Sequence, residues 1–184
     1  MSSDRSFRRL GLATGLAVLT LLGGCQVRPL YSESAGTGER LAAVSFAVPK
    51  GRVEQVVRNH LVFLSTGGSG PAERPAYNVT LDVTSTASSI IDDEDEDNVS
   101  PSGIPVPGRV QVSGTYTLTR ISDGQVLKSA KREVVAQMDV SGQGFAKVRA
   151  IRDAENRAAR ELAEFIRAEI AIVLARESQA AWSK

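Results

Sequence analysis

The chain has 184 residues, 42% of them hydrophobic and 23% charged, with a formal net charge of +1. This length suits one domain that buries a core, and the near-neutral charge without a basic, aromatic-interleaved stripe argues against a nucleic-acid partner. One cysteine and one histidine exclude an internal disulfide and any metal motif that needs two thiolates or two histidines.

The first 25 residues have the organisation of a lipoprotein export signal. Three arginines within the first nine residues precede Leu10–Leu22, an apolar run of thirteen residues that is shorter than the ~20 needed to span a bilayer. Leu22-Gly23-Gly24-Cys25 places small residues where a peptidase needs an uncrowded backbone. We predict a signal peptide over residues 1–24 and a diacylglyceryl group with a further acyl chain, such as palmitate, on Cys25. A plain signal peptide followed by an incidental cysteine is the alternative.

The acylated cysteine predicts a membrane location. Each buried methylene contributes ~0.8 kcal/mol, and two or more chains anchor a protein stably. Gln26 follows the cysteine in place of the aspartate that retains enteric lipoproteins in the inner membrane, so we expect the periplasmic face of the outer membrane. Residues 25–40 are rich in Gly, Ser and Glu and predict a lipidated tether, within which Pro29-Leu30-Tyr31 could dock on a surface.

Charge is unevenly distributed after the signal peptide. The remaining 160 residues carry 19 basic and 20 acidic side chains, with six consecutive acids at Asp92–Asp97. The rest of the body is therefore mildly basic, which is compatible with an anionic lipid or glycolipid partner. We predict a solvated loop over residues 92–108. A calcium loop is excluded because the sixth position lacks glycine and Gly103 occupies the twelfth.

A single domain is predicted over residues 41–176. Apolar runs or alternating patterns indicate strands, and apolar stripes at spacings of three, four and seven indicate helices. The expected elements, in chain order, are a strand at 41–48, a helix at 52–64, strands at 77–83, 109–119 and 125–138, and a helix at 145–175. Asp123-Gly124 predicts a hairpin turn between the last two strands, and residues 177–184 are expected to be a frayed tail.

The order β-α-β-β-β-α predicts an α+β fold. Both helices have one apolar stripe, so the simplest arrangement packs them on one face of a four-stranded mixed sheet. The opposite face would be polar, rich in threonine, and open to water or a partner. His60 lies at the edge of the first helix's apolar stripe, and we interpret it as a packing residue.

Four cations lie near the predicted hairpin: Arg109, Lys128, Lys131 and Arg132. Charged residues on an edge strand guard against aggregation. The alternative is a cationic patch that binds a ligand, for which phosphates would be the natural target. Both interpretations remain open.

The chain resembles the lipopolysaccharide-assembly lipoprotein LptE, in its alphaproteobacterial form, over nearly the whole mature length. Pro29-Leu30-Tyr31 matches the end of the motif after the family's lipidated cysteine, although Gln26 and Val27 depart from it. The other matches are Arg52, Gln55, Asn59 and Leu61 in the first helix, Tyr116, Leu118 and Gly124 at the hairpin, and Phe145-Ala146 with Arg152-Asp153-Ala154-Glu155 in the last helix.

The resemblance implies a plug and assembly partner of the outer-membrane barrel LptD, acting in lipopolysaccharide transport in a Gram-negative envelope and binding lipopolysaccharide through basic residues. An accessory lipoprotein of another envelope lipid-transport complex is the alternative. We expect no enzyme, because the chain has no Gly-x-Ser-x-Gly elbow and no thiol once Cys25 is acylated. We likewise expect no metal and no cofactor other than the covalent lipid.

Overall fold

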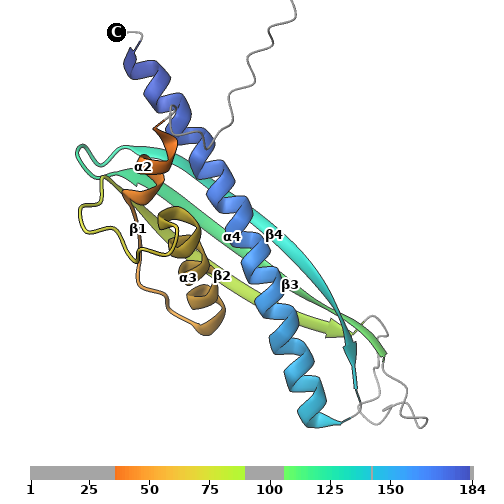
Figure 1. Cartoon of the computed structure of the whole chain (residues 1–184). Helices are drawn as coiled ribbons and strands as arrows, with labels where there is room; N and C mark the ends of the chain where they lie inside the picture. The colour runs from red at the N-terminus through yellow and green to blue at the C-terminus, as the bar shows by residue number, and fades with distance from the viewer. Residues whose placement is uncertain (1–35, 90–105, 142, 183–184) are drawn as a thin grey trace, which may run out of the picture.

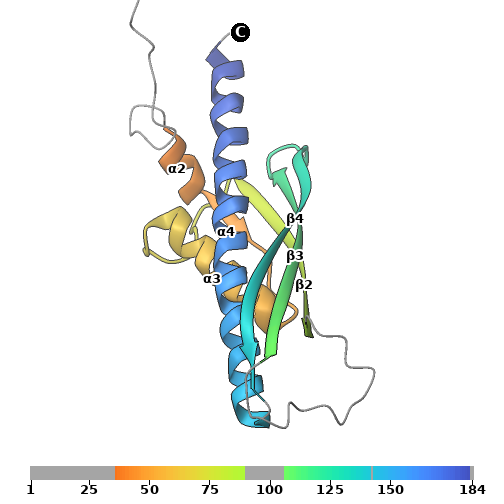
Figure 2. The same ribbon diagram turned by 90° about the vertical axis from the view of Figure 1, so that its right-hand side faces the viewer.

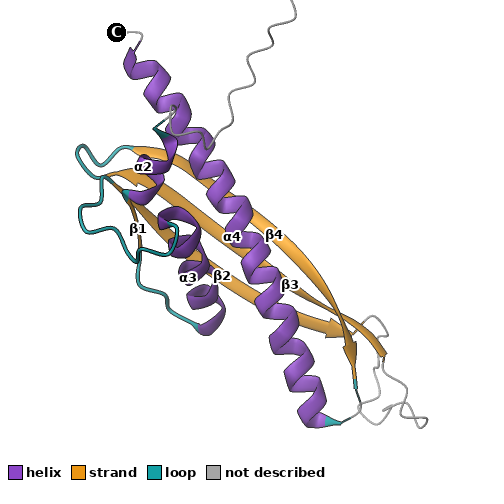
Figure 3. Ribbon diagram, in the orientation of Figure 1, coloured by secondary structure: helices purple, strands orange, loops and turns teal. Residues whose placement is uncertain are grey.

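The computed structural model describes residues 36–89, 106–141 and 143–182, so Cys25, most of the tether and the acidic run Asp92–Asp97 lie outside the described residues. Figures 1 and 3 show the elements. In chain order they are α2 (Thr37–Ala42), β1 (Val44–Phe46), α3 (Arg52–Thr66), β2 (Tyr77–Ser89), β3 (Val106–Arg120), β4 (Val126–Val140) and α4 (Gly144–Trp182).

The sheet has the order β1-β2-β3-β4. β1 pairs with β2 in parallel, and the other two pairings are antiparallel. The β2–β3 register runs unbroken from Tyr77 opposite Arg120 to Ser89 opposite Gly108. The turn between β3 and β4 holds Gly124 at a φ of 69°, a conformation that glycine adopts without strain. The predicted α+β fold with a four-stranded mixed sheet and a hairpin is confirmed.

Both long helices cover the same face of the sheet, as predicted. α4 runs along β3 and β4, while α3 lies beside it over β2 and β1 (Figure 2). α3 ends where Gly67 adopts the left-handed conformation at a φ of 63°, the usual way for a helix to stop at glycine. No described helix combines the length and the apolar character needed to cross a membrane.

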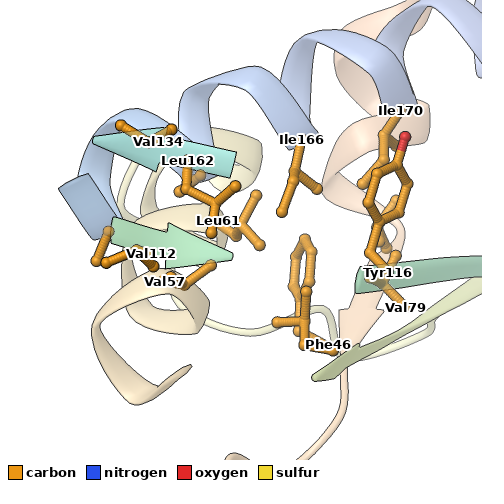
Figure 4. Close-up of a cluster of buried hydrophobic side chains, with 14 of the residues drawn as sticks. Phe46, Val57, Leu61, Val79, Val112, Tyr116, Val134, Leu162, Ile166 and Ile170 are labelled. Atoms are coloured by element: carbon orange, nitrogen blue, oxygen red, sulfur yellow. The ribbon is translucent and has the colours of Figure 1, made fainter. Parts of the chain in front are cut away.

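The core lies between the helices and the inward face of the three long strands (Figure 4). Tyr116, Leu162 and Ile166 are fully buried there. β3 has a glycine, Gly114, where α4 passes, and a Cβ at that position would lie 2.8 Å from Leu162 Cδ2. The close approach is helped by a row of small buried residues on α4: Ala154, Ala158, Ala159 and Ala163. Each fully buried leucine or isoleucine stabilises the domain by ~1.5–3 kcal/mol.

Several predicted boundaries were wrong. Residues 37–40, predicted as the end of the tether, belong to helix α2. Residues 41–48 do not form one strand, because Leu41 and Ala42 end helix α2 and only Val44–Phe46 pair with β2. Leucine and alanine favour a helix, whereas valine and phenylalanine favour a strand. The predicted loop ends early, because β3 begins at Val106 and pairs there with Val140.

The last helix is also longer than the sequence pattern predicts. It continues through Trp182, so residues 177–182 are helical instead of a frayed tail. An ion pair explains the extension, since Glu177 Oε1 lies 2.5 Å from Arg120 Nη2 at the end of β3. The carboxylate thereby fixes the last turns of α4 to the sheet.

Candidate functional site

The face of the sheet away from the helices has no layer packed on it within the described part of the chain. It carries the outward residues of three long strands, and every one of them is exposed or partly exposed. We call it the open face and define it as residues 78, 80, 82, 84, 86 and 88 of β2, 109, 111, 113, 115, 117 and 119 of β3, and 129, 131, 133, 135, 137 and 139 of β4.

The open face is polar and rich in threonine and serine, as predicted. Thr80 lies opposite Thr117 across β2 and β3, and Thr117 Oγ1 lies 3.2 Å from Ser129 Oγ on β4. Asp82 and Lys131 flank Thr115 in the next row. This surface offers donors and acceptors from one strand to the next, so it suits a polar partner and not an apolar one.

The four cations predicted from the hairpin do not form one site. Arg109 and Lys131 lie on the open face, but Lys131 is opposite Thr115, six residues along β3 from Arg109. That separation is roughly 20 Å at ~3.3 Å per residue. Lys128 and Arg132 project to the helix side, because they pair with the inward-facing Leu118 and Gly114. The structure therefore divides the group between two faces of the sheet.

Arg132 has a structural partner. Its Nε donates to Glu169 Oε1 on α4 at 2.8 Å, and the Tyr116 hydroxyl donates to the other carboxylate oxygen. Burial alone would raise the pKa of Glu169, but the hydrogen bonds from Tyr116 and Arg132 outweigh it and hold that pKa below its ordinary value. Burial and the hydrogen bond to Glu169 raise the pKa of Tyr116. These three side chains fasten α4 to the sheet.

A second surface, which the predicted site residues do not include, lies at the start of α4. Phe145 is 90% exposed and Val148 is 47% exposed, while Arg149 and Arg152 are also exposed. At 100° per residue these four side chains fall within about one third of the helix circumference. We call them the tip patch.

The tip patch contains two cations and no acid. The first turn of α4 has no acidic residue, and Arg149 and Arg152 lie just beyond that turn. Among the described residues neither Arg149 nor Arg152 has an ion-pair partner. An exposed aromatic ring beside unpaired arginines is typical of a surface that meets an anionic lipid. A helical wheel of residues 145–152 could have revealed the patch from the sequence.

The tip patch and the entry of the chain lie at opposite ends of the molecule. α2 lies beside the C-terminal part of α4, and the start of α4 lies at the other end (Figure 1). Phe145 and Glu177 are 32 residues apart on this helix, which corresponds to roughly 48 Å at 1.5 Å per residue. A molecule held at its α2 end therefore carries the tip patch far from that attachment.

His60 is placed as a packing residue. Its ring stacks on Phe63 with centroids 6.4 Å apart, and its Nε2 lies 3.7 Å from Glu164 Oε1 of α4. Among the residues that the structure describes, no cluster of three His, Cys, Asp or Glu side chains could hold a metal ion. The surfaces that stand out in this chain are therefore the open face and the tip patch.

Comparisons with solved structures identify proteins that share this fold. No family model and no curated protein matches the chain. A protein of Caulobacter crescentus assigned as a lipoprotein superposes with a TM-score of 0.59 at 22% identity, covering 77% of this chain and 97% of that chain. Rare lipoprotein B from Shewanella oneidensis superposes with a TM-score of 0.52 at 12% identity, covering 73% and 96%. The chain thus shares its fold, over most of its length, with these two lipoproteins.

Proposed function

We propose that the chain is an outer-membrane lipoprotein, anchored by acyl chains on Cys25, that serves as plug and assembly partner of the barrel LptD in lipopolysaccharide transport. The open face is the observation that carries the proposal. The lumen of an outer-membrane barrel is polar, and a long, threonine-rich sheet face that no described element covers is a matching surface. The fold shared with two lipoproteins and the Leu22-Gly23-Gly24-Cys25 sequence support an anchored envelope protein.

The length of the molecule suits the same role. α4 has 39 residues, which gives roughly 58 Å at 1.5 Å per residue, and a bilayer with its headgroups is about 40–45 Å thick. A body held at its α2 end on the periplasmic side and standing in a barrel would carry the tip patch to the level of the opposite leaflet. Arg149 and Arg152 would there meet lipid phosphates, which planar guanidinium groups bind with two parallel hydrogen bonds.

The proposal assigns binding to the tip patch instead of the cations near the hairpin. Arg132 already pairs with Glu169, so a ligand phosphate would have to displace a carboxylate. Arg109 donates to Ser88 Oγ at 3.3 Å, and Lys131 stands about 20 Å away on the open face. These two residues fit better in a protein interface than in a phosphate site.

Pull-down from detergent-solubilised envelopes tests the partnership. We expect the affinity-tagged chain to retain a barrel of far higher mass whose electrophoretic mobility changes on heating. Thr117→Arg, on the middle strand of the open face, should lower the recovery of that barrel. A matched change on the helix side, Phe63→Arg at a residue that is 58% exposed, should leave recovery unchanged. Recovery of an inner-membrane transporter instead of a barrel would favour the alternative lipid-transport role and refute the proposal.

A further inference from the structure

A pocket of about 650 Å³ opens at the end of the domain where the chain enters from the tether. It lies between α2, the segment before β2, the β3–β4 turn and the last turns of α4. Four of its lining residues are apolar and four are charged. They are Ala43, Pro75, Ala76 and Ile121, and Glu39, Arg40, Arg120 and Glu177.

The walls of this pocket are fixed without any ligand. Ala76 N donates to Ala43 O at 2.9 Å, and Ile121 N donates to Ala76 O at 2.9 Å. These two bonds tie three separate segments of the chain side by side. Arg120 closes another side through its ion pair with Glu177. Because the pocket is preformed, its walls lose little conformational entropy when a ligand binds, and this makes the binding free energy more favourable.

The pocket leaves apolar surface in contact with water. Ile121 is 50% exposed, and Pro75 and Ala76 are also exposed. Arg40 is partly exposed and has no ion-pair partner among the described residues. An aliphatic side chain next to an aromatic one would match this surface, since the first covers the apolar wall and the second stacks on a guanidinium group.

The tether supplies such a pair within reach. Pro29-Leu30-Tyr31 ends five residues before Gly36, which precedes the first turn of α2. Five extended residues span up to about 17 Å, and Arg40 is one helical turn beyond Gly36. A linker this short gives an effective concentration on the order of millimolar, so weak contacts suffice.

We propose that Pro29-Leu30-Tyr31 docks in this pocket, with Leu30 against Ile121 and Ala76 and the Tyr31 ring against Arg40. Docking leaves only the four residues from Cys25 to Pro29 as a free linker, about 14 Å when extended. The whole span to Gly36 would otherwise reach about 39 Å. If Cys25 is acylated as proposed above, the docked tether holds the α2 end of the body close to the bilayer surface.

Disulfide formation in the full chain tests the docking. Cys25→Ser removes the native thiol, so the result does not depend on lipidation. Arg28→Cys, directly before the docking segment, is paired with Ser122→Cys, which lines the pocket, so the proposed contacts of Leu30 and Tyr31 stay intact. The reference pair is Ser34→Cys with Ser122→Cys, because residue 34 is closer along the chain to Gly36 and would meet the pocket at least as often in a freely moving tether. We expect the pair with residue 28 to oxidise about tenfold faster, because docking raises its effective concentration.

Two further variants separate docking from chance encounter. Leu30→Ser should slow the oxidation to the rate of the reference pair, whereas Val48→Ser, at a residue that is 84% exposed and outside the pocket, should not. Equal rates for the two pairs, insensitivity to Leu30→Ser, or disulfides formed only between two molecules would each overturn the proposal.

Discussion

Removing the exposed ring at the start of α4 should weaken binding to an anionic lipid surface. Phe145 is 90% exposed, so nearly its whole side chain is free to enter a lipid layer, and burying a phenylalanine stabilises by ~1.5–3 kcal/mol. Phe145→Ser should therefore reduce the partition coefficient roughly 10- to 150-fold. Reversal of Arg149 and Arg152 to glutamate should remove at least ~2 kcal/mol at low salt, because each arginine near an anionic surface contributes about 1 kcal/mol.

The assay is co-sedimentation with vesicles that contain purified lipopolysaccharide, with the Cys25→Ser chain so that the anchor does not contribute. Phe165→Ser is the matched control, since Phe165 lies on the same helix and is 50% exposed. Its neighbours Arg160, Glu161 and Glu164 carry charges of both signs. That control should bind as the parent does, and binding of the parent should fall with added salt. Equal binding by the Phe145→Ser and Phe165→Ser variants would refute the assignment of the tip patch.

Four other substitutions probe the core, an ion pair and the anchor. Leu162→Ala should lower the free energy of unfolding by ~2–5 kcal/mol in denaturant, and Gly114→Ala should also lower it because of the 2.8 Å approach to Leu162. The double variant should lose at least ~1 kcal/mol less than the sum of the two single losses. Strict additivity of the two losses would contradict this packing. Because the pKa of Glu169 is lowered in the folded state, the stabilisation from its carboxylate is present above its unfolded-state pKa and is lost as the pH falls through its folded-state pKa. Glu169→Gln should therefore flatten the acid side of the curve of unfolding free energy against pH. An unchanged curve would exclude this ion pair as a source of acid sensitivity. Cys25→Ala should leave the circular dichroism spectrum unchanged and move the protein from the membrane to the soluble fraction, and retention in the membrane would contradict acylation.

Much of the fold could be predicted because each long element has a clear period. The alternation in Tyr77–Val83 and Arg109–Thr119 indicated which side chains face the helices. The residues between them point the other way and are mostly polar, which predicted the open face. Helix α2 was missed because its six residues are too few for a helical period to be visible. The end of α4 was missed because the ion pair between Glu177 and Arg120 joins residues 57 apart in sequence.

The candidate site was harder to predict than the fold. Lys128, Lys131 and Arg132 are neighbours in sequence, but alternation along β4 sends Lys131 to one face of the sheet and the other two to the opposite face. Arg132 is paired with Glu169, a partner that only the packing of α4 on β4 brings near. The tip patch is recognised by what its side chains do not contact. Its side chains are exposed, and Arg149 and Arg152 have no ion-pair partner among the described residues.

Photocrosslinking in cells tests most directly whether the open face is the docking surface of an anchored plug. A photoreactive amino acid at Thr117 probes that face, and the same group at Phe63, which is 58% exposed on α3, probes the opposite side of the body. Position 117 should crosslink to a large outer-membrane barrel with a higher yield than position 63. A crosslink from position 117 to soluble proteins only, or none above background, would contradict it.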